Sequence, residues 1–186
     1  MTGPANAPYA ASVTTTPPPF QVLFVCAGNT CRSPLAAALL RRALGSGSGV
    51  RVESAGVVAV PGSPATRNAQ EVARVVGLDL SAYRAHRLDD PLLATSDLIL
   101  TMDSYELEVV RQRVPGAADR ASLVTDFARE KPTGEGIPDP FGGSLEAYEE
   151  CLRRLEECVS RILPAVLREA RARGAAGAGR EEGRSS

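Results

Sequence analysis

Two cysteines and an arginine stand close together near the start of the chain. The stretch FVCAGNTCRSP, residues 24–34, contains Cys26, Cys31 and Arg32. Four kinds of site use such residues: a metal knuckle, a redox pair, a buried structural turn, or a nucleophile on an anion-binding loop. A zinc knuckle needs paired Cys or His ligands at a shorter spacing, and the chain has one histidine. We therefore expect no metal.

The residues between the cysteines predict a phosphate-binding loop. An apolar run ends at Val25, and Gly28 and Asn29 are residue types that readily adopt positive φ. Pro34 suits the first turn of a helix. A loop of this kind turns its N–H groups inward at a helix N-terminus and forms a nest for an anion. Cys26 would lie at the bottom of this nest, facing the phosphorus.

Arg32 is the cation that such a nucleophile would need. A thiol has an ordinary pKa of about 8.5, and each unit of lowering requires about 1.4 kcal/mol. A helix dipole supplies only about 0.3 to 2 kcal/mol, so the amides and Arg32 must supply most of the rest. The guanidinium can also bind two phosphate oxygens at once. A buried structural cysteine is the alternative, but the strand, loop, arginine and helix start together favour the nucleophile.

Transfer of a phosphoryl group to cysteine also needs an acid and later a base. The sole histidine, His86, has no neighbouring feature that directs it to the loop, and we expect it to be either at the surface or hydrogen-bonded within the fold. Asp139 in IPDPFGG is the better candidate, since Pro140 favours an extended backbone and the following glycines allow close approach to a ligand. An ordinary Asp-Pro turn is the alternative for Asp139.

Apolar runs and helical periodicities alternate along the chain. They predict strands over 21–25, 50–54, 98–102 and 121–125, and helices over 34–44, 66–76, 104–114 and 145–171. This order indicates an α/β fold of three layers, flavodoxin-like, in which a four-stranded parallel sheet is flanked by helices. The ligand crevice of such sheets lies beyond the carboxyl ends of the strands, where Cys26 is expected.

Composition limits the class of protein. The 186 residues are 44% hydrophobic and 23% charged, which fits one soluble domain, and the net charge of −1 gives no reason to expect nucleic acid or membrane partners. We predict a disordered tail over 1–19, one domain over 20–172 and a second tail over 173–186. The absence of a signal peptide or membrane span predicts a cytoplasmic protein with free thiols and no cofactor, and we expect a monomer.

Two motifs together resemble a known family. VCAGNTCRSP, followed more than a hundred residues later by DPFGGS, is similar to the low-molecular-weight protein tyrosine phosphatases. The resemblance extends over about 21–171 and includes ESAG and DLILTMD. It implies the phosphotyrosine protein phosphatase I fold and phosphorylated protein substrates, without a metal.

The resemblance also implies roles for individual residues. Cys26 would form a phosphocysteine, and Asp139 would act first as general acid and then as base. Asn29, Ser33 and Ser54 would brace the loop and the thiolate by hydrogen bonds. The phosphate-binding set would be Ala27, Gly28, Asn29, Thr30, Cys31, Arg32 and Ser33.

Departures from the tyrosine-specific pattern bear on the substrate. Thr30 stands where tyrosine-specific members usually carry a bulky aliphatic residue, and VVAV follows SAG where they often have an aromatic residue. These features resemble the branch that dephosphorylates phosphoarginine, with Phe141 stacking on the guanidinium and Asp139 pairing with it. Drift at Thr30 is the alternative, and would leave a tyrosine phosphatase.

Cys31 and three other classes of protein complete the alternatives. Cys31 is either only a small loop residue or, as the resemblance implies, the residue that forms a disulfide with Cys26 on oxidation. Thioredoxin-linked arsenate reductases would need resolving cysteines after the third strand, whereas Cys151 and Cys158 lie on the last helix, where packing explains them. A non-catalytic binding module would be expected to lose Cys26 or Asp139. A phosphocarrier would need no hydrolytic base.

Overall fold

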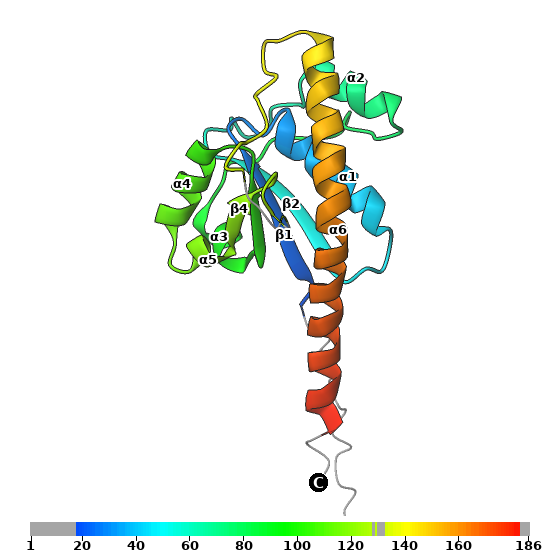
Figure 1. Ribbon diagram of the computed structural model, residues 1–186, viewed down its shortest axis with the longest axis vertical. Helices are drawn as coiled ribbons and strands as arrows, with labels where there is room; N and C mark the ends of the chain where they lie inside the picture. Colours follow the sequence, from blue (N-terminus) through cyan, green and yellow to red (C-terminus); the bar gives the residue numbers. More distant parts are fainter. Residues whose placement is uncertain (1–17, 128, 130–132, 183–186) are drawn as a thin grey trace, which may run out of the picture.

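The computed structural model describes residues 18–127, 129 and 133–182, and contains a four-stranded sheet with helices on both faces (Figure 1). The strands are parallel and lie in the order β2-β1-β3-β4. Their bounds are β1 Phe20–Cys26, β2 Val50–Gly56, β3 Leu98–Thr101 and β4 Ala121–Leu123. The fold class predicted from the sequence is therefore confirmed, and each strand lies where an apolar run predicted one.

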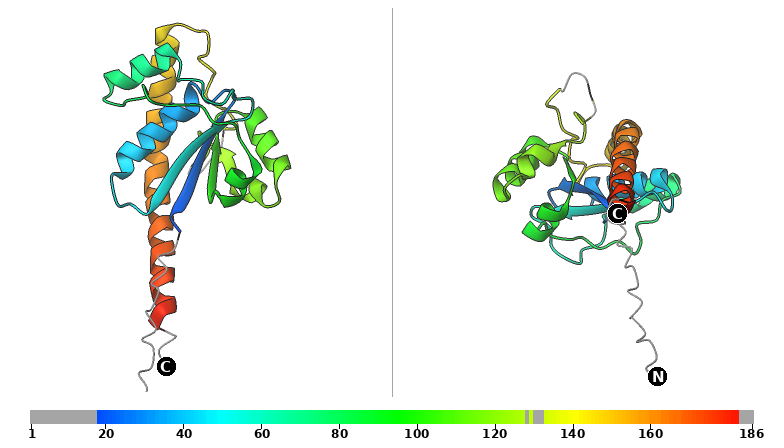
Figure 2. Two further views of the ribbon diagram at one scale, coloured as in Figure 1. Left: turned by 180° about the vertical axis from the view of Figure 1, so that it is seen from behind. Right: turned by 90° about the horizontal axis from the view of Figure 1, so that it is seen from below.

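Residues of the central strand β1 alternate between two hydrophobic clusters. Val22 and Phe24 belong to the cluster under α1 (Arg32–Leu44) and α6 (Leu145–Glu182). Leu23 and Val25 face the other cluster, under α3 (Asp90–Thr95), α4 (Ser104–Arg113) and α5 (Ala117–Arg120). Figure 2 shows these two groups of helices on opposite faces of the sheet. A strand that is buried on both faces explains why its sequence is a continuous apolar run.

Side chains at the helix starts explain where several helices begin. Thr66 caps α2 (Arg67–Val75) by accepting a hydrogen bond from Ala69 N, and Asp89 caps α3 in the same way through Leu92 N. Asp103 and Glu106 form a complete capping box at α4. The sequence prediction omitted α3 and α5, which have 6 and 4 residues and are too short to show a helical period.

The last helix differs from its prediction. α6 continues through Pro164 to Glu182, so residues 173–182 are helical where a disordered tail was predicted. This segment is rich in alanine, the best helix former, and its glycines cost only about 1 kcal/mol each. Arg173 also makes an ion pair with Asp97 and lies 5.4 Å from the centre of the Phe20 ring. The predicted domain end at 172 therefore falls inside α6.

The far end of α6 projects beyond the sheet, away from the carboxyl ends of the strands (Figure 1). The N-terminal tail predicted over 1–19 lies outside the described residues except for its last two. No helix in the part of the chain that the structure describes is long and apolar enough to cross a lipid bilayer.

Candidate active site

The loop between β1 and α1 is held by the side chain of Asn29. Asn29 has a φ of 55° and is the one non-glycine residue with positive φ in the described part of the chain. Its Oδ1 accepts hydrogen bonds from the Tyr83 hydroxyl at 2.6 Å and from His86 N at 2.7 Å. Its Nδ2 donates to the hydroxyls of Ser33 at 2.8 Å and Ser54 at 3.1 Å. The buried amide thus uses both of its ends to fix a strained loop.

His86 contributes only its backbone to this network. Its imidazole is exposed, which is one of the two settings expected from the sequence. Tyr83, by contrast, was not predicted. Its hydroxyl also lies 3.0 Å from Ser54 Oγ, and burial raises its pKa to about 12, so the hydroxyl remains neutral and can donate.

Cys26 ends β1 beneath this loop, with its side chain buried. Its Sγ lies 2.9 Å from Ser33 Oγ and accepts a hydrogen bond from Asn29 N at 3.2 Å. Burial is the largest influence and raises the pKa of Cys26, while the Ser33 hydroxyl, the charge of Arg32 and the Asn29 amide act to lower it. The sequence indicates only the lowering influences, whereas in the folded chain burial outweighs them.

Arg32 begins α1 and is 2% exposed. Its NH1 donates to Asp103 Oδ2 at 3.2 Å and to the Ile137 carbonyl at 3.1 Å. Its NH2 donates to Asp139 Oδ2 at 2.7 Å and to Glu106 Oε1 at 3.4 Å. Nε is buried and has no hydrogen-bond partner within the described residues. Three carboxylates therefore share one guanidinium, which leaves Nε–H as its free donor.

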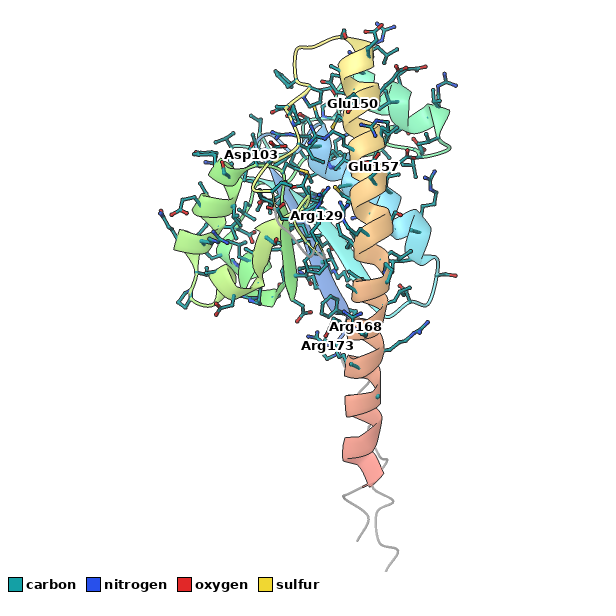
Figure 3. All side chains as sticks on the ribbon, viewed as in Figure 1. Asp103, Arg129, Glu150, Glu157, Arg168 and Arg173 are labelled. Atoms are coloured by element: carbon teal, nitrogen blue, oxygen red, sulfur yellow. The ribbon has the colours of Figure 1, made fainter. Side chains whose placement is uncertain are left out.

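Asp103 and Glu106 were not among the site residues predicted from the sequence. Asp103 is the N-cap residue of α4 and lies near the segment that connects β4 to α6 (Figure 3). The signal was present, since D-x-x-E directly after an apolar strand is a capping box, but a capping box does not show that its carboxylates also face an arginine. Burial raises the pKa of Glu106 above its ordinary value, while the positive charge of Arg32, 3.4 Å away, acts in the opposite direction and favours the carboxylate form.

Asp139 comes to the site from the segment between β4 and α6. Its side chain is 44% exposed, and its Oδ1 accepts a hydrogen bond from Phe141 N at 3.2 Å. The segment is anchored next to β3, because Ile137 N donates to the Met102 carbonyl at 2.7 Å. Asp139 is thus the most exposed of the three carboxylates around Arg32, ahead of Asp103 at 38% and the buried Glu106.

These side chains surround a cavity of about 210 Å³ at the carboxyl end of β1. Thr30, Val58 and Phe141 are among the residues that line it, and Val58 and Phe141 are 58% and 69% exposed. The full lining is Cys26, Ala27, Gly28, Thr30, Cys31, Arg32, Val58, Asp139 and Phe141. The predicted nucleophile, cation and acid thus share one cavity, and Val58 is an addition to the prediction.

The other three cysteines lie in two different settings. Cys31 lines the same cavity, but its Sγ also lies 3.3 Å from the Tyr148 hydroxyl and 3.4 Å from Thr66 Oγ1. Cys151 and Cys158 are 3% exposed and belong to the core cluster beneath α6. Their burial matches the packing role predicted for them. Across the described residues no three His, Cys, Asp or Glu side chains are grouped so that they could hold a metal ion.

Comparison with known proteins places this arrangement in a family. The family model described as low molecular weight phosphotyrosine protein phosphatase matches residues 21–172. The chain belongs to this family. The family resemblance stated from the sequence is confirmed, and the chain is a phosphatase, a hydrolase.

Relatives within the family carry two different names. The chain is 38% identical over 144 residues to a protein-arginine-phosphatase of Geobacillus stearothermophilus, covering 77% of this chain and 94% of the relative. It is also 38% identical over 148 residues to the probable low molecular weight protein-tyrosine-phosphatase EpsP of Ralstonia nicotianae, covering 78% and 94%. The solved structure of YwlE arginine phosphatase from Geobacillus stearothermophilus superposes with a TM-score of 0.74 at 36% identity, over 81% of this chain and 95% of that one. Equal identities to the two kinds of relative leave the substrate open.

Proposed function

We propose that the chain hydrolyses phosphorylated protein side chains through a phosphocysteine intermediate, and that it prefers phosphoarginine to phosphotyrosine. The observation that supports the chemistry is that one cavity is lined by Cys26, Arg32 and Asp139. A nucleophile, a cation for the phosphate and an exposed carboxylate are the three groups that the reaction needs.

In the first step, Cys26 Sγ attacks the phosphorus of the bound substrate. The S–P bond forms while the bond from phosphorus to the leaving oxygen or nitrogen breaks, and Asp139 gives its proton to that leaving atom. The loop amides and the Arg32 guanidinium hold the phosphoryl oxygens, on which negative charge develops. The hydrogen bonds from Ser33 and Asn29 stabilise the sulfur as a thiolate.

In the second step, water hydrolyses the intermediate. Asp139, now a carboxylate, takes a proton from the water whose oxygen attacks phosphorus. The P–S bond breaks, inorganic phosphate leaves, and the thiolate of Cys26 is restored. Neither step requires a cofactor or a metal ion.

The cavity walls support the phosphoarginine preference. Val58 follows SAG, where tyrosine-specific members often have an aromatic residue that packs against the phenyl ring of phosphotyrosine. Phe141 is therefore the aromatic residue that lines the cavity here. One aromatic face suits stacking on a planar guanidinium, and Asp139 beside it offers a carboxylate to the N–H groups of that guanidinium. The hydroxyl of Thr30 narrows the floor and provides a further hydrogen bond.

The test is phosphate release from a phosphoarginine peptide and a phosphotyrosine peptide under matched conditions. Cys26→Ser is the blank, and Thr30→Ile and Val58→Tyr are the specificity variants. We expect faster release from phosphoarginine in the parent chain and a reversed order in Thr30→Ile. A parent that favours phosphotyrosine would refute the arginine preference alone, whereas no release from either peptide would refute the phosphatase mechanism.

Cys31 is proposed as the redox partner of Cys26. Peroxide would oxidise the Cys26 thiolate to a sulfenic acid with release of hydroxide, and the Cys31 thiol would attack that sulfur, forming the disulfide and releasing water. Cys31→Ser should then lose the activity that thiols restore to the peroxide-treated parent. We further propose a monomer that acts in the cytoplasm on phosphorylated proteins, without nucleic acid or membrane partners.

A further inference from the structure

The capping box of α4 offers one oxygen of each carboxylate to the helix and the other to Arg32. Asp103 Oδ1 accepts from Glu106 N at 3.1 Å, while its Oδ2 accepts from Arg32. Glu106 Oε2 accepts from Asp103 N at 2.8 Å, while its Oε1 accepts from Arg32. The helix N-terminus thus fixes the direction in which both carboxylates present their remaining oxygen.

Glu106 and Asp139 share the same nitrogen, NH2 of Arg32, and differ in how firmly they are held. Glu106 is fully buried and tied to the backbone of Asp103, whereas Asp139 is 44% exposed on a connecting segment. When Asp139 acts on the leaving group as a protonated acid, it can no longer be the anionic partner of NH2. Glu106 is then the carboxylate that still holds this nitrogen.

From these contacts we propose that Glu106 is the positioning residue for Arg32, keeping its guanidinium directed at the bound phosphate while Asp139 serves the leaving group. This role rests on the function proposed above, in which Arg32 binds phosphoryl oxygens. Free Nε–H, and NH2 once Asp139 has released it, are the two donors that the phosphate would take. Asp103 and the Ile137 carbonyl keep NH1 in place.

Glu106→Gln separates this role from helix capping. Glutamine has one carbonyl oxygen. We expect it to accept the hydrogen bond from Asp103 N, which is 2.8 Å long in the parent chain, rather than the one from Arg32 NH2, which is 3.4 Å long. The amide NH₂ group would then face the donors of Arg32, so the cap remains while the contact with Arg32 becomes repulsive. Loss of a negative charge alone would have the opposite effect on an anion, since it would tighten phosphate binding. The sign of the change therefore identifies the role.

The measurement is the protection of Cys26 from iodoacetate by inorganic phosphate, followed by mass spectrometry in the full-length chain. It reports phosphate binding without turnover. We expect Glu106→Gln to raise the phosphate concentration that halves the alkylation rate of Cys26 about tenfold, because the loss of one hydrogen bond to a charged group has an effect of this size. Glu108→Gln, which removes an exposed carboxylate from the same helix, should leave it unchanged. An unchanged or lower value in Glu106→Gln would overturn the role of Glu106.

A second variant covers the case in which glutamine impairs folding. Glu106→Asp keeps the charge but withdraws both oxygens by one methylene, and it should also weaken protection; full protection in a folded Glu106→Asp chain would contradict the proposal. Failure of phosphate to protect the unmodified chain would instead refute the phosphate site itself. The two failures are therefore distinguishable.

Discussion

At the scale of single residues, the ion pair between Arg32 and Asp139 means that a phosphate would compete with Asp139 for the guanidinium. In the structure, NH2 of Arg32 donates a hydrogen bond to Asp139 Oδ2 at 2.7 Å. A bound phosphate would accept a hydrogen bond from the same nitrogen. Substrate binding must therefore break an interaction before it makes one. Because that interaction involves Asp139, the proposed catalytic acid, binding would also free this side chain for the leaving group.

Asp139→Asn should separate binding from chemistry. We expect kcat to fall by about 10²- to 10⁴-fold, because the proton donor is gone. Inorganic phosphate should bind several-fold more tightly, because asparagine competes less well for Arg32. Steady-state kinetics and competitive inhibition by phosphate give both values. Weaker phosphate inhibition in the variant would show that Asp139 does not compete for Arg32.

The thiol of Cys26 supplies a second residue-scale prediction. Burial raises its pKa, and the Ser33 hydroxyl is the foremost influence in the other direction. Ser33→Ala should therefore raise the pKa further and reduce the thiolate fraction at neutral pH. The pH dependence of the alkylation rate of Cys26 measures this value in both chains. A curve displaced to lower pH in Ser33→Ala would contradict the assigned contact.

At the scale of elements, the end of β2 presses against the phosphate loop. A Cβ on Gly56 would lie 2.5 Å from the Ala27 carbonyl oxygen and 2.8 Å from Asn29 N, both backbone atoms. Gly56→Ala should therefore displace the loop, with loss of phosphatase activity and about 1–3 kcal/mol of stability. Chemical denaturation and activity assays measure the two effects.

Gly174→Ala is the matched control for this substitution. Gly174 lies within α6, and no atom would come within 4 Å of an added Cβ. Alanine there should raise the free energy of unfolding by up to about 1 kcal/mol without changing activity. A Gly56→Ala chain that behaves like Gly174→Ala would mean that the loop moves aside at little cost.

Local patterns could predict the elements and the ends of the strands, and therefore the place of the site. The strand of residues 20–26 is apolar except for Gln21, and the loop after it contains Gly28 and Asn29, residue types that readily adopt positive φ. What these patterns could not give is the meeting of distant segments. Glu106 is an ordinary capping residue in the sequence, and it faces Arg32 only because the starts of α4 and α1 meet at the carboxyl end of the sheet. Tyr83 reaches Asn29 in a similar way, from a segment with no regular pattern of its own.

At the scale of the whole molecule, α6 contacts the amino ends of β1 and β3, at the end of the sheet opposite the candidate site. Arg173 forms its ion pair with Asp97 just before β3, and Asp97 Oδ2 also accepts from Gln21 N at 2.8 Å. Figure 3 shows Arg173 beside the start of the sheet. The composition of residues 173–182 could not predict this, because the contact depends on where the helix axis passes.

Truncation tests this contact. A chain that ends after Gly174 should have a free energy of unfolding within about 0.5 kcal/mol of the full-length value. A chain that ends after Ala172 should have a free energy of unfolding about 1–2 kcal/mol lower still, because it lacks the partly buried ion pair of Arg173 and its contact with Phe20. Arg173→Ala in the full-length chain is the control and should lose a similar amount. Equal stability of the two truncated chains would contradict the role of Arg173.

The direction of α6 has a practical consequence for attachment. Its far end projects away from the carboxyl ends of the strands (Figure 1), and the cavity lined by Cys26, Arg32 and Asp139 lies at the carboxyl end of β1. A fluorophore, an affinity tag or a surface linker joined beyond residue 174 would hold the protein by this end, with the cavity facing the solution. Large phosphorylated proteins could then approach an immobilised enzyme as freely as small peptides do.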